Sequence, residues 1–103
     1  IKKDDGKINF SKTAQEIYNL YRAFSLWPGI LCVWGKKRLK LLKIIKAEEN
    51  LEPGKVLIKN KRIFVGCGEK SIEILELQLE GKNAMSAEVF ANGYRDFNNQ
   101  KLK

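Results

Sequence analysis

The stretch Arg38-Leu39-Lys40-Leu41-Leu42-Lys43-Ile44-Ile45-Lys46-Ala47 decides the fold, because it fits two different secondary structures. As a helix it is cationic and amphipathic, the kind of segment that lies on a membrane surface or in an acidic groove. As a strand it places Leu39 and Leu41 on one face, and the phase slips by one residue at Leu41-Leu42. Such a slip is typical of a β-bulge, which bends a strand toward a barrel. Ile44-Ile45 and the neighbouring hairpins favour the strand.

The residues that follow this stretch form short alternating segments separated by turns. The expected strands are Lys55–Lys59, Arg62–Val65 and Ser71–Leu79. The last of them should point Leu75, Leu77 and Leu79 inward. The turns and breaks are Glu52-Pro53-Gly54, Asn60-Lys61 and Gly66-Cys67-Gly68. Short strands with a turn at intervals of roughly eight to twelve residues indicate a small β-barrel.

A helix and a strand are expected before the decisive stretch. Ser11 or Thr13 can cap the helix, and Glu16, three residues after Thr13, would complete a capping box. The apolar residues that share one face of this helix are Ala14, Ile17, Leu20, Tyr21 and Phe24. Pro28-Gly29 ends the helix, and Ile30–Trp34 is predicted to be a strand. The first eight residues are charged and turn-prone, which predicts a leading strand or a linker.

The C-terminal end is predicted to hold one short helix and a tail. Ser86 can cap a helix over Ala87–Ala91, which Gly93 closes. Residues 94–103 are mostly polar, and we expect them to fray. The predicted organisation is therefore one domain over residues 1–93 and a polar tail over residues 94–103.

Composition and charge narrow the range of functions. The chain has 103 residues with 20 Lys and Arg, 12 Asp and Glu, and no His, which removes the commonest general base and metal ligand. Residues 1–47 hold eleven basic and three acidic residues, a net charge of +8, whereas residues 48–103 hold nine of each. The absence of a long apolar run or a signal-peptide pattern predicts a cytoplasmic protein that does not cross a membrane.

Two cysteines and two glutamates are the remaining candidates for chemistry. Cys32 and Cys67 lie in apolar runs and are predicted to be buried free thiols, because two cysteines are too few for a zinc site and no histidine is present to activate them. Glu76 and Glu80 are better explained by strand alternation than as a catalytic pair. We therefore expect no catalytic residue and no metal in this chain.

The basic residues form the candidate binding site. Six cations and no acid lie between Lys36 and Lys46, a concentration of charge that favours an anionic polymer. Such a surface neutralises phosphates and releases counterions, and it positions a nucleic acid without reading its sequence. Trp27 and Trp34 could stack on bases, but burial tendencies assign both to the core.

A series of motifs, in order over about nine tenths of the chain, resembles the C-terminal domain of methionyl-tRNA formyltransferases. The matching segments are Asp5–Ser11, Ala14, Ile17, Arg22–Gly29, Leu39–Leu41, Pro53–Leu57, Val65–Gly68, Leu75–Gln78, Gly81-Lys82 and Met85–Ala87. The Trp27-Pro28-Gly29 triplet favours the tRNA enzyme over related formyltransferases. The sequence departs from the family pattern at Phe10 in place of Trp, Ser25-Leu26 in place of Asn-Pro, and Gly66 in place of Ala.

The resemblance implies a mainly β fold: a small open Greek-key, OB-like barrel with one N-terminal and one short C-terminal helix. It implies that the domain helps to hold initiator methionyl-tRNA in translation initiation. A separate catalytic N-terminal domain, absent from this chain, would transfer a formyl group from 10-formyltetrahydrofolate. The parent would be an enzyme, this chain alone would not, and we expect a monomer without a cofactor of its own. The expected tRNA-binding residues are Arg22, Lys36, Lys37, Arg38, Lys40, Lys43 and Lys82.

Two alternatives stay open on the residues alone. A stand-alone basic OB-type module that binds RNA or single strands explains the charge but not the ordered motifs. A module for membrane surfaces or acidic partners requires the stretch from Arg38 to Ala47 to be helical.

Overall fold

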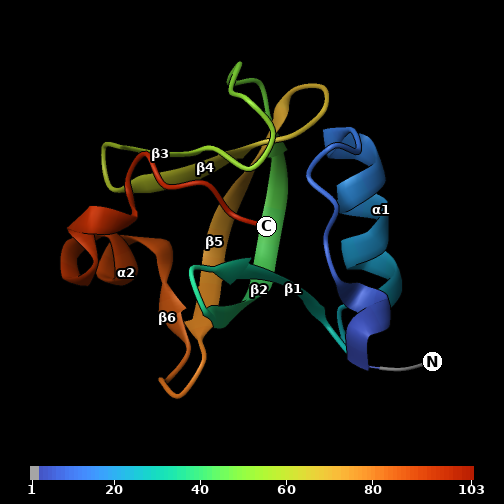
Figure 1. Ribbon diagram of the computed structural model, residues 1–103, viewed down its shortest axis with the longest axis horizontal. Helices are drawn as coiled ribbons and strands as arrows, with labels where there is room; N and C mark the ends of the chain where they lie inside the picture. The colour runs from blue at the N-terminus through green and yellow to red at the C-terminus, as the bar shows by residue number, and fades with distance from the viewer. Residues whose placement is uncertain (1–2) are drawn as a thin grey trace.

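The computed structural model describes residues 3–103, which form a six-stranded antiparallel sheet and two α-helices (Figure 1). The strands are β1 (Ile30–Trp34), β2 (Lys37–Ala47), β3 (Val56–Lys59), β4 (Arg62–Gly66), β5 (Ser71–Leu79) and β6 (Met85–Ser86). The helices are α1 (Ala14–Phe24) and α2 (Ala87–Gly93), with 3-10 turns η1 (Lys3–Gly6) and η2 (Arg95–Phe97). The predicted mainly β class, with one N-terminal and one short C-terminal helix, is confirmed.

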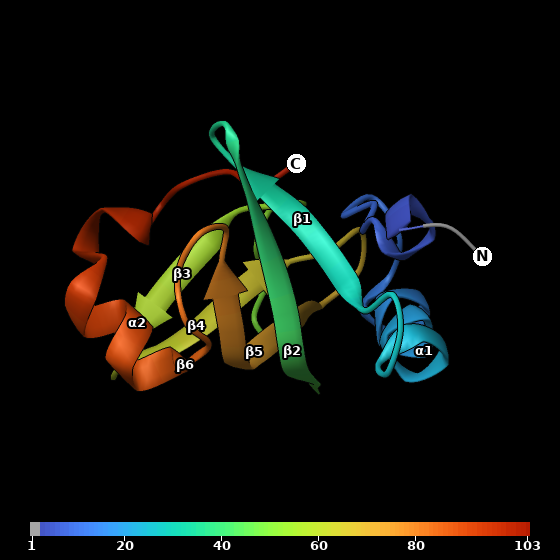
Figure 2. The same ribbon diagram turned by 90° about the horizontal axis from the view of Figure 1, so that it is seen from below.

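The decisive stretch is a strand, which removes the helical alternative for it. The strands lie in the order β1-β2-β5-β4-β3, and β6 pairs with β5 (Figure 2). β3, β4 and β5 are joined by tight turns, while β2 lies beside β5, so these four strands form a Greek key. In the β3–β4 turn, Asn60 and Lys61 both have positive φ, as a two-residue type I′ hairpin requires.

Two bulges bend the central β2–β5 pair. Leu41 pairs with Leu77 and Lys43 with Glu76, so Leu42 is an extra residue in β2, at the predicted slip. Ile44 then pairs with Ile74, which leaves Leu75 unpaired in β5. The second bulge reverses the phase of β5, and the prediction that Leu75 points inward is therefore wrong: it is 39% exposed.

The C-terminal segment is ordered, so the prediction of a frayed tail is wrong. Phe97 and Leu102 are buried, and the backbone of residues 99–103 pairs with two strands. Val56 of β3 donates to Gln100 (2.9 Å) and accepts from Asn99 (3.0 Å), while Val33 of β1 and Lys103 exchange two hydrogen bonds (2.8 and 2.9 Å). The segment therefore runs between the two outer strands of the open sheet and connects them.

The N-terminal segment and α1 pack against the same sheet. Ile8 donates to the Leu31 carbonyl (2.9 Å), which attaches the leading residues to β1; Ile1 and Lys2 lie outside the described residues. Thr13 caps α1, accepting a hydrogen bond from the Glu16 backbone, while the Glu16 carboxylate accepts one from the Thr13 backbone. The predicted capping box is confirmed.

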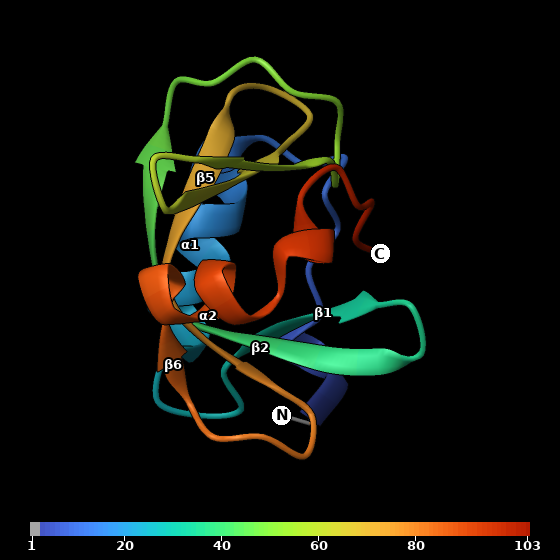
Figure 3. The same ribbon diagram turned by 90° about the vertical axis from the view of Figure 1, so that its left-hand side faces the viewer.

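The two tryptophans lie in opposite environments. Trp34 packs edge-on against Phe90, Tyr94 and Phe97. Figure 3 shows α2, the helix that carries Phe90, in front of the sheet. Trp27 is 58% exposed and Leu26 is 99% exposed in the loop after α1. The core assignment is confirmed for Trp34 and wrong for Trp27. Neither helix within residues 3–103 is long and apolar enough to span a membrane.

Candidate nucleic-acid interface

The β1–β2 hairpin presents four of the predicted cations. Trp34 pairs with Lys37, so the turn contains only Gly35 and Lys36. Gly35 alone has positive φ, as at the first central position of a type II′ turn. Lys36 and Lys37 are exposed at the tip.

Strand alternation places the other two cations just below the tip. Leu39 and Leu41 are buried on the inner face of β2, whereas Arg38 and Lys40 are exposed on the outer face. This confirms the alternation predicted for these residues. A rigid, paired hairpin therefore holds Lys36, Lys37, Arg38 and Lys40 within one short segment.

The turn after β5 adds a fifth cation. Lys40 pairs with Gln78 across the strands, and the Gln78 side-chain amide donates to the Lys82 carbonyl (2.9 Å). Lys82 donates in turn to Leu79 (2.9 Å), and Gly81 supplies the positive φ that this turn requires. The backbone of Lys82 is thereby fixed beside β2. We call Lys36, Lys37, Arg38, Lys40 and Lys82 the hairpin patch.

One carboxylate lies within the hairpin patch. Glu80 accepts a hydrogen bond from the Arg38 backbone N–H (2.8 Å) and donates its own N–H to the Arg38 carbonyl (2.9 Å). A shallow depression of about 220 Å³ is lined there by Arg38, Lys40, Gln78, Leu79, Glu80 and Gly81. Five cations against one carboxylate leave the surface strongly positive.

The other predicted cations lie outside the hairpin patch. The Lys43 ammonium is 3.8 Å from the Glu76 carboxylate. Arg22 lies on α1 with its guanidinium 5.8 Å from the Tyr18 ring centroid, on an element separate from the hairpin tip (Figures 1 and 2). Lys46, from the same basic run, donates to the Gln15 side chain (2.6 Å). The structure therefore places Lys36, Lys37, Arg38, Lys40 and Lys82 around the hairpin, Lys43 on the same outer face of β2 beyond the bulge, and Arg22 on a different element, α1.

The two cysteines and two glutamates that were candidates for chemistry each have a structural explanation. Burial raises the pKa of both Cys32 and Cys67 to about 12, which keeps these buried thiols protonated at neutral pH. Glu76 faces Lys43, and Glu80 binds backbone, so the two carboxylates do not act as a pair. No cluster of metal-binding side chains occurs in residues 3–103.

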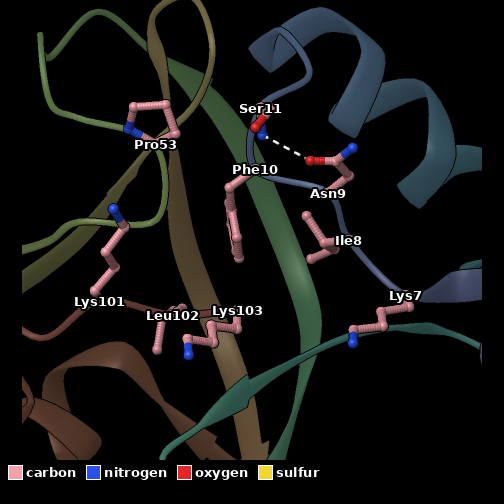
Figure 4. A pocket seen from close by; sticks show the side chains of 9 residues that line it. All are labelled: Lys7, Ile8, Asn9, Phe10, Ser11, Pro53, Lys101, Leu102 and Lys103. Atoms are coloured by element: carbon pink, nitrogen blue, oxygen red, sulfur yellow. Dashed lines mark hydrogen bonds between the residues drawn. The ribbon is translucent and has the colours of Figure 1, made fainter.

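Sequence reasoning missed a second group of lysines, Lys7, Lys101 and Lys103. They line a hollow of about 610 Å³ between the N-terminal and C-terminal segments (Figure 4). The only available signal was the alternation of Lys101 and Lys103 around the apolar Leu102. That signal was overlooked because the tail was expected to fray.

Comparison with known proteins places this basic β domain in a family. The family model "Formyl transferase, C-terminal domain" matches residues 1–95, and the chain belongs to this family. Among its curated relatives are the methionyl-tRNA formyltransferases of Koribacter versatilis (41% identity, 99% of this chain and 33% of that protein) and Geobacter metallireducens (44% identity, 92% and 31%). The chain thus spans about a third of the length of these relatives.

Solved structures support the fold at low sequence identity. HypX from Aquifex aeolicus, in its A392F-I419F variant, superimposes with a TM-score of 0.75 and 14% identity over 94% of this chain and 18% of that protein. The structure of HypX with tetrahydrofolic acid gives a TM-score of 0.74 at 15% identity, over the same shares of the two chains. At these identities the similarity establishes a shared fold only.

Proposed function

We propose that this domain binds the sugar–phosphate backbone of tRNA through the hairpin patch. The observation that carries the proposal is the excess of cations on a rigid hairpin, which no other role in the fold requires. Lys36 and Lys37 have no ion pair within the described residues, so their charge is available to phosphates. Contacts of this kind give affinity and orientation rather than base specificity.

In the longer relatives, the proposed role is to hold initiator methionyl-tRNA for a catalytic domain. That domain would precede this one and transfer the formyl group from 10-formyltetrahydrofolate, in the cytoplasm. The support is the family membership together with the absence of histidine from this chain. The folate would bind to the catalytic domain, and this domain would act as a monomer.

The test is tRNA binding by a charge-reversed variant. We expect the triple variant Lys36→Glu, Lys37→Glu, Lys40→Glu to lose most of its affinity at low salt. The slope of log K against log salt should become shallower by about 2 to 3, since each phosphate contact contributes about 0.9 on a duplex.

The matched control is Lys59→Glu, Lys61→Glu, Lys70→Glu, which changes the net charge equally. These exposed lysines pair with Glu49, Glu88 and Glu48 at 2.8, 3.5 and 3.1 Å, away from the hairpin tip. Equal loss of affinity in the two variants would show that only net charge matters and would contradict the proposal. Tighter binding of an unstructured RNA strand than of tRNA would favour a general single-strand module instead.

A further inference from the structure

The hollow between the two terminal segments has the chemistry of an anion-binding groove. Lys7 lies on one side of it and Lys101 and Lys103 on the other, with Asn9 and Ser11 on the rim (Figure 4). The buried side chains of Phe10 and Leu102 reach it from opposite sides. No acidic side chain lines this hollow, which we call the terminal groove.

Backbone hydrogen bonds fix the lysines of the terminal groove in place. Ile8, beside Lys7, donates to the Leu31 carbonyl (2.9 Å), and Leu102 donates to the Gly54 carbonyl (2.8 Å). Lys103 itself exchanges two hydrogen bonds with Val33. The Cα positions therefore belong to the folded sheet, so less conformational entropy is lost when the side chains bind a ligand.

No side-chain carboxylate in the part of the chain that the structure describes pairs with the lysines of the terminal groove. Within the described residues, Lys7, Lys101 and Lys103 form no ion pair and their side chains are exposed. In contrast, Lys59 at the end of β3, Lys61 in the β3–β4 turn and Lys70 in the loop before β5 each face a glutamate. The groove therefore attracts anions, while those lysines are balanced locally.

The terminal groove lies next to the hairpin patch. Lys103 pairs with Val33, and Val33 pairs across β1–β2 with Arg38, so two strand spacings of about 4.8 Å separate their backbones. The resulting separation of roughly 10 Å is close to the Debye length at 0.1 M salt, so one polyanion experiences both surfaces together.

We propose that the terminal groove is a second contact for the sugar–phosphate backbone, continuing the path that starts at the hairpin patch. The inference rests on the proposed tRNA binding and extends it to Lys7 and to two lysines beyond the family match, Lys101 and Lys103, since that match ends at residue 95. The backbone of Lys101 and Lys103 thus belongs to the segment that closes the sheet, while their side chains would bind the phosphates.

The experiment compares two neutralised variants of the 103-residue chain. Lys7→Gln, Lys101→Gln, Lys103→Gln empties the groove of charge, and Lys59→Gln, Lys61→Gln, Lys70→Gln is the control with the same net charge. We expect the groove variant to bind tRNA about tenfold more weakly in 0.1 M salt, with a shallower salt slope by about 2, while the control retains near-normal affinity. The melting temperature should stay unchanged in the groove variant, because the backbone pairing remains.

Comparing the groove variant with the hairpin reversal distinguishes the failure of the groove inference from the failure of the proposed function. If the hairpin reversal weakens binding and the groove variant matches its control, the groove inference is wrong and the proposed function stands. If neither set weakens binding, both proposals fail. If the groove variant loses binding to phosphatidylserine vesicles but not to tRNA, the groove serves a membrane surface and the inference is overturned.

Discussion

Trp27 is exposed, although tryptophan is a residue type that is mostly buried in folded proteins. It lies in the loop between α1 and β1, beside Leu26, and neither side chain has a place in the core. Trp34, seven residues further on at the end of β1, packs against three aromatic rings. General tendencies rank tryptophan as mostly buried, but they cannot tell a loop position from a strand position.

The contrast predicts two separable fluorescence signals. In the Trp34→Phe variant, the remaining Trp27 should emit at long wavelength and be quenched by iodide. In Trp27→Phe, the remaining Trp34 should emit at shorter wavelength and resist quenching. Similar quenching of both tryptophans would contradict the placement of Trp27. Addition of tRNA should leave the Trp27 signal unchanged, because the proposed contacts lie on other elements.

The capping box of α1 predicts a dependence of stability on pH. Hydrogen bonds from the Thr13 backbone and side chain lower the pKa of Glu16 below its usual 4.5. A lowered folded-state pKa stabilises the fold above the unfolded pKa, and this contribution is lost as pH falls through the folded value. Glu16→Gln should therefore be less stable than the parent at pH 7, and the difference should disappear at acid pH in urea unfolding.

At the scale of elements, the C-terminal segment is the part that holds the outer strands together. Gln100 bonds through its backbone to Val56 of β3, Leu102 to Gly54 just before β3, and Lys103 to Val33 of β1. The Asn98 side chain also accepts a hydrogen bond from the Ile58 N–H (2.8 Å). Leu102 is 2% exposed and anchors the segment. The strand edges that it covers would otherwise present unpaired backbone groups.

Leu102→Ala should therefore destabilise the whole domain. Removing a buried leucine side chain costs about 2 to 5 kcal/mol of unfolding free energy, and urea unfolding measures it. The control in the same segment is Gln100→Ala, whose side chain is exposed and whose backbone bonds persist. It should stay within about 0.5 kcal/mol of the parent. Equal stability of the two variants would mean that the segment is not part of the cooperative core.

The elements that could be predicted are those with local signals. The capping box, the bulge at Leu42, the Asn60-Lys61 turn and the strand β5 each follow from a few adjacent residues. The orientation of Leu75 and the closure by residues 99–103 depend on pairing across distant strands, which no local pattern contains. Gly66 illustrates the same limit: a Cβ there would clash with the Glu52 carbonyl oxygen, and no local sequence pattern contains this contact.

In the candidate site too, residues that are neighbours in the sequence could be predicted, and residues that only the fold brings together could not. Lys36, Lys37, Arg38 and Lys40 were predictable because they are neighbours in one hairpin, and Lys82 because its motif follows β5. Lys7 meets Lys101 and Lys103 only after the chain has closed on itself. Lys43 stays a predicted contact, and its pairing with Glu76, on a strand that is far away in the sequence, could not be read from the basic run.

At the scale of the whole molecule, the covered edges predict a monomer. Ile8 and Lys103 bond to the edge of β1, and residues 98–100 bond to the edge of β3. A second copy therefore finds these two edges already paired and cannot add a strand there. The positive charge of the N-terminal half also opposes close approach of two copies. Sedimentation equilibrium should give a mass near 11.8 kDa at every concentration. A mass that rises with concentration would show an interface outside the strand edges.

The position of the closing segment also constrains when the domain can fold. β1 and β3 emerge from the ribosome before residues 99–103, which pair with them. During synthesis the nascent chain therefore carries two strand edges with unpaired backbone N–H and C=O groups. Native closure must wait until the last of these residues has left the exit tunnel. In the cell, this domain should therefore reach its final shape after translation of its own sequence is complete, with protection by chaperones most valuable in that interval.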